Sequence, residues 1–139
     1  MSGLDRFTQA QAPVYEQVLE ELRAAAKATH WMWFIFPQLR GLGSSAMAQR
    51  YGIADLPEAV AYLRHPLLGP RLLECTGLLL QAPVSLGATN ILGAVDALKL
   101  RSCLTLFRLA SRAEPFDAAL TRFFGGEADL RTIRLLRDA

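Results

Sequence analysis

The sequence predicts an all-α fold, a compact multihelical single domain that spans residues 1–139. The 25 leucines and 21 alanines make up about a third of the 139 residues, whereas valine and isoleucine together supply nine. Leucine and alanine are strong helix formers, and the β-branched residues are those that favour strands. The length is that of one domain with one hydrophobic core. We expect about six to eight mostly short helices, one of them central and buried.

Composition and charge exclude several classes of protein. The chain is 52% hydrophobic and 20% charged, which excludes intrinsic disorder. No apolar run approaches the roughly 18 residues that a membrane span needs, so we expect no membrane partner. The net charge of +2 and the lack of clustered Lys and Arg argue against a nucleic-acid partner. The oligomeric state is left open.

The start of the chain and the cysteines predict a cytoplasmic location. Residues 1–7 show no basic stretch followed by an apolar one, the pattern of a secretory signal. Cys75 and Cys103 stand in apolar surroundings and form no C-x-x-C pair. We expect both to be buried free thiols.

Periodicity and helix-end signals predict seven helices. They cover residues 13–27, 46–51, 55–64, 71–81, 97–110, 115–124 and 130–137. The first opens at Pro13, which suits a first turn because its missing N–H would have been unpaired there. Its apolar stripe consists of Val14, Tyr15, Val18, Leu19, Leu22 and Ala26. The second follows Ser45, a good N-cap residue.

Helix 55–64 has the spacing of a capping box, with Asp55 and Glu58 three residues apart, and must stop before Pro66. Helix 71–81 is the most apolar segment, and we predict it to be the central, buried helix. Its apolar side chains are Leu72, Leu73, Leu78, Leu79 and Leu80. A loop over 83–89 and a turn at 90–93 follow.

The three remaining helices have polar N-caps or glycine stops. Asp96 is expected to cap helix 97–110, and Asp129 to cap helix 130–137. Gly125 and Gly126 should end helix 115–124. The last helix carries arginines at intervals of three, and we interpret it as a surface helix rather than a phosphate-binding tail.

One segment breaks the helical pattern, because four of the twelve aromatic residues fall within six positions. They are Trp31, Trp33, Phe34 and Phe36. Pro37 disfavours the α conformation at the preceding residue, so any helix should end there. The segment is either a buried hydrophobic plug or one wall of a pocket in which Trp31 or Trp33 stacks on a planar ligand.

Several segments along nearly the whole chain resemble one family. They are residues 30–38 (HWMWFIFPQ), residues 41–44 (GLGS), Tyr51 with residues 53–56 (IADL), Gly93 with Asp96, Lys99 and Leu100, Ser102 with residues 105–107 (TLF), and residues 124–126 (FGG) with Asp129 and Thr132. In these segments the chain resembles the bacterial family called domain of unknown function 1810 (DUF1810). The pair Cys103-Leu104, where relatives tend to have Ser-Met, is a small departure that concerns packing.

The resemblance implies a compact multihelical fold with a central buried helix and brings no established activity. Members of the family often carry the label calpastatin. Nothing in this sequence looks like the disordered, proline-rich repeats of calpain inhibitors, so the label does not guide our interpretation.

The two lysines are the most informative charged residues. Thirteen arginines accompany only Lys27 and Lys99, so a retained lysine suggests a need for a compact ammonium or an amine that can lose its proton. Lys99 follows Asp96 by one helical turn. Asp96 and Lys99 are therefore our candidate catalytic residues, with an N-cap and its first-turn lysine as the alternative.

The unusual stretches predict one polar-lined pocket, because buried polar groups need partners. The candidate ligand-binding residues are His30, Trp31, Trp33, Gln38, Gly43, Ser44 and Ser102. Gly43 and Ser44 precede a helix whose first N–H groups could meet an anion, although an ordinary turn with a Ser N-cap is the simpler interpretation. No metal site and no cofactor are predicted, because His30 and His65 are far apart and belong to no ligand motif.

Three functions remain open. The leading hypothesis is a domain that binds a small, nucleotide-like molecule. A sharper version is a hydrolase of glycosidic bonds in ADP-ribose-like conjugates, with Lys99 as nucleophile or charge clamp and Asp96 as acid and base. The rival is a non-catalytic protein-interaction module. The sequence does not decide whether the protein is an enzyme.

Overall fold

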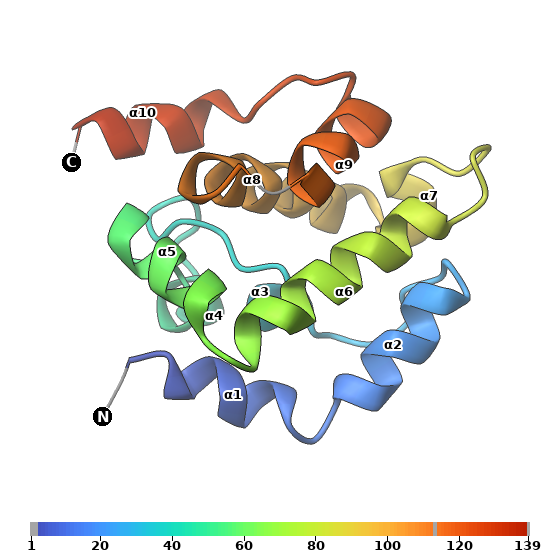
Figure 1. Ribbon diagram of the computed structural model, residues 1–139, viewed down its shortest axis with the longest axis horizontal. Coiled ribbons are helices and arrows are strands. Elements are labelled where there is room, and N and C mark those ends of the chain that lie inside the picture. The colour runs from blue at the N-terminus through green and yellow to red at the C-terminus, as the bar shows by residue number, and fades with distance from the viewer. Residues whose placement is uncertain (1–2, 113, 139) are drawn as a thin grey trace.

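The computed structural model describes residues 3–112 and 114–138, and over these residues the chain forms ten α-helices and no strand (Figure 1). They are α1 (Asp5–Gln11), α2 (Tyr15–Arg23), α3 (Met32–Ile35), α4 (Ala46–Arg50), α5 (Leu56–Arg64), α6 (Leu68–Gln81), α7 (Ala88–Leu92), α8 (Ala94–Ala110), α9 (Glu114–Phe124) and α10 (Leu130–Asp138). The all-α class is confirmed. The predicted number of helices was too low, because α1 and the short helices α3 and α7 were not foreseen.

The helix predicted over 13–27 is shorter than expected. It is α2, which ends at Arg23, and Ala25 then takes a left-handed φ of 54°. The backbone N–H of Lys27 no longer continues the helix but donates to the carbonyl of Ile91 at 2.9 Å. The chain thereby leaves α2 and lies against the end of α7.

Two long helices, α6 and α8, carry most of the packing. Helix α6 contacts α2, α5 and α9, while α8 contacts α5, α7, α9 and α10. Residues 102–107 of α8 are buried one after another, whereas Leu73 of α6 is 39% exposed. The part of the fold that is buried on all sides is therefore the middle of α8, and α6, which we predicted to be the central helix, buries only one face.

Helix α8 begins three residues earlier than predicted. Gly93 ends α7 and caps α8 with a φ of 90°, a conformation that costs glycine little because it has no Cβ. The chain can therefore turn sharply and start α8 at Ala94. Asp96 lies in the first turn of α8 and is not its N-cap, which corrects our prediction.

The other predicted caps are confirmed. The carboxylate of Asp55 accepts a hydrogen bond from the N–H of Glu58 at 2.9 Å, and the hydroxyl of Ser45 accepts one from the N–H of Ala48 at 3.1 Å. At the start of α10, the carboxylate of Asp129 accepts a hydrogen bond from the N–H of Thr132 at 3.0 Å. Helix α9 ends at Phe124, directly before the two predicted stop glycines.

Buried hydrophobic side chains from helices as far apart in the chain as α1 and α9 form one contiguous cluster. Helix α10 packs across α8, as the upper left of Figure 1 shows. Among the described residues, no helix has the length and apolar character needed to cross a membrane.

Candidate functional site

In the aromatic segment over residues 31–36, some side chains are buried in the core and one lines a pocket, so each of the two predicted alternatives holds for part of the segment. It forms the single-turn helix α3, and Phe36 ends it, as Pro37 predicts. Trp31, Phe34 and Phe36 are buried in the hydrophobic core, whereas Trp33 is only partly buried. The segment is a core plug in most positions and a pocket wall at Trp33.

A buried carboxylate explains why Trp31 belongs to the core. Oε1 of Glu21 accepts hydrogen bonds from Nε1 of Trp31 at 2.9 Å and from the N–H groups of Ala28 and Thr29. Oε2 accepts from the hydroxyl of Thr29 at 2.6 Å and from the amide of Gln17 at 3.0 Å. Burial by itself raises the pKa of Glu21, but the hydrogen bonds from Thr29 and Ala28 outweigh it and lower the pKa to about 2.

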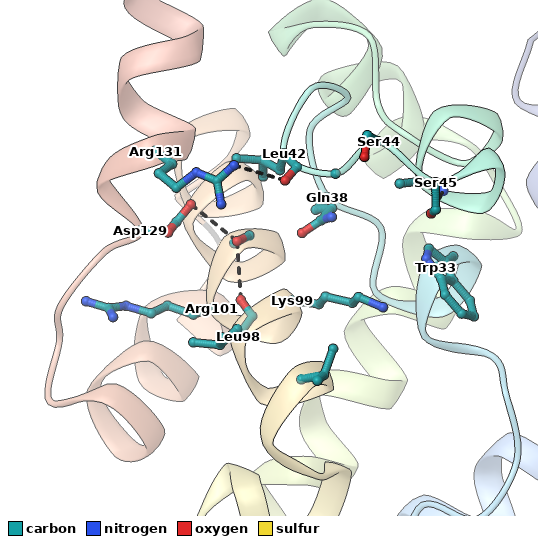
Figure 2. A pocket seen from close by; sticks show the side chains of 14 residues that line it. Trp33, Gln38, Leu42, Ser44, Ser45, Leu98, Lys99, Arg101, Asp129 and Arg131 are labelled. Atoms are coloured by element: carbon teal, nitrogen blue, oxygen red, sulfur yellow. Dashed lines mark hydrogen bonds between the residues drawn. The ribbon is translucent and has the colours of Figure 1, made fainter.

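A pocket of about 560 Å³ lies between the loop over 38–45, helix α8 and the start of α10 (Figure 2). The residues that line it are Trp33, Gln38, Leu42, Gly43, Ser44, Ser45, Ala48, Val95, Leu98, Lys99, Arg101, Ser102, Asp129 and Arg131. The volume lies within the range of about 300–1,000 Å³ of small-molecule sites. The wall is mixed, with apolar side chains from α8 and polar or charged side chains from all three segments.

Backbone bonds hold the loop over 38–45 in place. The N–H of Ile53 donates to the carbonyl of Gln38 at 2.9 Å, and the N–H of Arg40 donates to the carbonyl of Ile53 at 2.7 Å. Gly43 sits against helix α4, since a Cβ there would lie 3.1 Å from that of Ala48. The loop therefore lies close to its neighbours, and Gly43 leaves little room for a side chain.

Lys99 forms the cationic part of the α8 wall. Its Nζ lies 4.1 Å from the centre of the Trp33 ring and 3.5 Å from Oδ1 of Asp96. Figure 2 shows the Lys99 side chain extended across the pocket toward Trp33. The ammonium thus covers one face of Trp33, so a planar ligand meets the lysine before it meets that face.

The second lysine of the chain binds the same carboxylate. Nζ of Lys27 lies 2.9 Å from Oδ2 of Asp96 and 5.0 Å from the centre of the Trp31 ring. Each lysine therefore pairs with one oxygen of Asp96 and with one of the two tryptophans. The sequence singled out these lysines, but it gave no sign that they meet.

The opposite wall comes from the start of α10. Oδ2 of Asp129 accepts hydrogen bonds from the hydroxyls of Ser102 and Thr132 and from the N–H of Thr132. The guanidinium of Arg131 donates to the carbonyl of Leu42 at 3.0 Å, which joins α10 to the loop. In Figure 2 the Arg131 guanidinium lies between Asp129 and Leu42.

Arg101 contributes less charge to the pocket than its position suggests. Its guanidinium donates to the backbone carbonyls of Glu127 and Ala128 and pairs with the carboxylate of Glu127. Figure 2 shows the side chain directed away from Lys99. Arg101 therefore fixes the segment that leads into α10.

Six of the nine predicted site residues line this pocket together, namely Trp33, Gln38, Gly43, Ser44, Ser102 and, from the catalytic pair, Lys99. His30, Trp31 and Asp96 do not line it. His30 is exposed, because the chain between α2 and α3 turns it outward, and Trp31 is held in the core by Glu21. Asp96 lies behind Lys99 and reaches the pocket only through that lysine.

The sequence missed the contribution of the C-terminal segment. Asp129 and Arg131 were noted only as a cap and as part of a surface helix, yet both line the pocket. Ser102 and Asp129 are 27 residues apart and meet only because α10 packs on α8. No local pattern could have shown this. Among residues 3–112 and 114–138, no group of three His, Cys, Asp or Glu side chains is placed to hold a metal ion.

Comparisons with known proteins give a family and a similar structure. A family model described as "Protein of unknown function (DUF1810)" matches residues 1–136. The crystal structure of the conserved hypothetical protein Rv1873 from Mycobacterium tuberculosis is 57% identical and superposes with a TM-score of 0.94 over 96% of each chain. A search of the curated proteins finds no match to the chain.

Proposed function

The chain belongs to the DUF1810 family, and we propose that it binds a small, nucleotide-like ligand in the pocket between the 38–45 loop, α8 and α10. One observation carries the proposal. Trp33 and Gln38 from the aromatic segment converge on the same cavity as Lys99 and Ser102 from α8. These are the two stretches in which polar side chains interrupt apolar sequence, and such side chains need partners.

The chemistry of the walls favours a ligand with one apolar part and one anionic part. Val95 and Leu98 are 67% and 65% exposed and stand one turn apart on α8, where both line the pocket. They offer an apolar surface for a base or a similar ring. Lys99 and Arg131 supply positive charge from facing elements, which suits a phosphate.

A thermal-shift screen with nucleotides, sugars and dinucleotides tests the proposal. A ligand present at a hundredfold excess over its Kd stabilises the native state by about 2.7 kcal/mol, which a melting curve resolves. We expect stabilisation by adenosine monophosphate and weaker or no stabilisation by uncharged sugars. Absence of a shift with every nucleotide and dinucleotide would contradict the proposal.

A binding domain fits the contacts better than a glycosidic-bond hydrolase. In the hydrolase hypothesis Asp96 is the acid and base, but Asp96 is outside the pocket and its two oxygens are each paired with a lysine. Lys99 is paired with both Asp96 and Trp33, an arrangement suited to a charge clamp rather than to a nucleophilic amine. The rival interaction module predicts no stabilisation by any metabolite, so the same screen separates it from the binding domain.

A further inference from the structure

The Lys27–Asp96–Lys99 cluster, defined by these three residues, retains a net positive charge. Two ammonium groups share one carboxylate, so only one of them is neutralised. Lys27 is the closer partner at 2.9 Å, with 8% of its side chain exposed, whereas Lys99 is 3.5 Å away and 20% exposed. A shorter and more buried ion pair is the stronger one. Asp96 is therefore held mainly by Lys27, and the uncompensated charge resides on Lys99 at the pocket wall.

The wall that faces Lys99 adds a second cation. Arg131 lines the same pocket from α10, and its guanidinium donates one hydrogen bond to the carbonyl of Leu42. A guanidinium has five N–H donors, so it retains donors for a ligand. Oδ2 of the nearby Asp129 carboxylate already accepts hydrogen bonds from Ser102 and from the first turn of α10. The pocket therefore presents a cation on each of two walls, Lys99 on α8 and Arg131 on α10.

We propose that Lys99 is the group that binds a phosphate monoester in this pocket, and that Asp96 and Lys27 are positioning residues that act through it. A phosphate monoester carries about 1.5 to 2 negative charges at neutral pH, so the two cations attract it more strongly than a singly charged group. A carboxylate carries one charge and is attracted less strongly. The inference rests on the proposed function, since it names the chemical class that the pocket recognises.

The cluster explains how a residue outside the pocket controls affinity. While Lys27 holds Asp96, Lys99 is loosely paired and exchanges Asp96 for a ligand oxygen at little cost. Without Lys27, Asp96 pairs with Lys99 alone, so its carboxylate competes with the ligand for the Lys99 ammonium. Lys27 thus acts on the ligand only as long as Lys99 is present.

A double-mutant cycle of Lys27→Met and Lys99→Met, with adenosine monophosphate as probe and calorimetry as the measurement, tests this dependence. We expect Lys27→Met to raise the Kd about tenfold when Lys99 is present and less than about twofold in the Lys99→Met background. A merely structural role for Lys27 would weaken binding equally in both backgrounds, and that result would overturn the inference. Arg23→Met, which removes an exposed charge at the end of α2, is the matched control and should leave the Kd unchanged.

A second measurement, tryptophan emission, is made on the unmodified protein, and a variant serves only to assign the signal to one residue. Binding of the phosphate draws the Lys99 ammonium away from the Trp33 ring, so tryptophan emission should change saturably with adenosine monophosphate. The change should vanish in Trp33→Phe. Adenosine, which lacks the phosphate, and acetate, which carries one charge, should bind at least about tenfold more weakly than the monophosphate.

The two measurements separate the inference from the function on which it rests. Thermal stabilisation by adenosine monophosphate without a change in emission and without coupling between the lysines would overturn only the role of the cluster. Equal binding of adenosine and the monophosphate would overturn the phosphate class. Absence of any binding would overturn the proposed function, and the inference with it.

Discussion

Nε1 of Trp31 lies 2.9 Å from Oε1 of Glu21, so the indole of the aromatic segment is anchored to a carboxylate inside the protein. Glu21 is buried, with 5% of its surface exposed. Its five hydrogen-bond donors come from Gln17, from residues 28–29 and from Trp31. This contact joins α2 to the segment that leads into α3, and it therefore sets the position from which Trp33 enters the pocket.

Replacement of Glu21 should destabilise the fold more than any other single carboxylate change in α2. Glu21→Gln keeps the shape but loses the charge and turns an NH2 group toward Thr29, so we expect the free energy of unfolding to fall by about 2–3 kcal/mol. Urea denaturation at pH 7 measures it. Glu20→Gln, an exposed position in the same helix, is the control and should change stability by less than about 0.5 kcal/mol. Equal stabilities of the two variants would contradict this role for Glu21.

The same carboxylate makes stability depend on acid pH. The pKa of Glu21 is lowered from 4.5 in the unfolded chain to about 2 in the native state. A lowered native pKa contributes stability above the unfolded value and loses it as the pH falls through the native value. We expect Glu21 to contribute about 3 kcal/mol at pH 7, lost between about pH 4.5 and 2. Urea denaturation between pH 7 and 2 should show a smaller loss for Glu21→Gln than for the unmodified protein, and parallel pH profiles would refute it.

Arg122 should stabilise the end of α6 through the backbone. Its guanidinium donates to the carbonyls of Leu79, Leu80, Ala82 and Pro83, at 2.7 to 3.1 Å. The first two carbonyls lie in the last turn of α6, where helix acceptors lack intrahelical partners, and the other two directly follow the helix. Arg122→Ala should lower the free energy of unfolding by about 2 kcal/mol and speed amide exchange at the end of α6.

Arg122→Lys should recover only part of this loss, since an ammonium cannot span four carbonyls as a planar guanidinium does. The exposed Arg112, replaced by Ala, serves as the control. If Arg122→Ala unfolds at the same urea concentration as Arg112→Ala, the cap contributes nothing.

Both cysteines should be unreactive while the protein is folded. Cys75 and Cys103 are free and buried. Burial raises the pKa of Cys75 to about 12 and holds the pKa of Cys103 well above its ordinary value, and the thiol form is a poor nucleophile. At pH 8, Ellman's reagent should modify neither thiol in native buffer and both in denaturing urea. Rapid modification of the native protein would show that the core around α6 and α8 opens.

Arg131 and Arg134, both on α10, allow a comparison between an arginine that lines the pocket and one that does not. Arg131 lines the pocket, whereas Arg134 is exposed and does not. Arg131→Met should raise the Kd for adenosine monophosphate about tenfold, because a cation that faces the phosphate is lost. Arg134→Met removes the same charge from the same helix and should change the Kd by less than about twofold. Titration calorimetry compares them, and equal effects would indicate that only net charge matters.

Features that depend on neighbouring residues were predictable from the sequence. The caps at Ser45, Asp55 and Asp129 each bond a backbone N–H three residues on, so sequence spacing alone identifies them. The stop at Pro37 is local in the same way. The cap at Asp96 was wrong because Gly93, with its positive φ, opened the helix earlier than the polar residue suggested.

Features that depend on tertiary packing were not predictable. Trp31 and Trp33 are two positions apart in one aromatic run, and only the partner carboxylate of Glu21 decides that the first belongs to the core. Lys27 and Asp96 are far apart in sequence, so their ion pair follows from the contact between the end of α2 and α7. The pocket itself requires α10 to pack on α8, which no helical pattern specifies.

Because both lysines contact Asp96, chemical modification of lysine can report on this cluster in the unmodified protein. The side-chain amines of this chain are those of Lys27 and Lys99, and both contact Asp96. Apart from the N-terminal amine, a reagent that acylates amines can therefore modify the protein only at this cluster. Peptide mass mapping after brief acylation would report the state of one pocket wall in the unmodified protein, without a label introduced anywhere else.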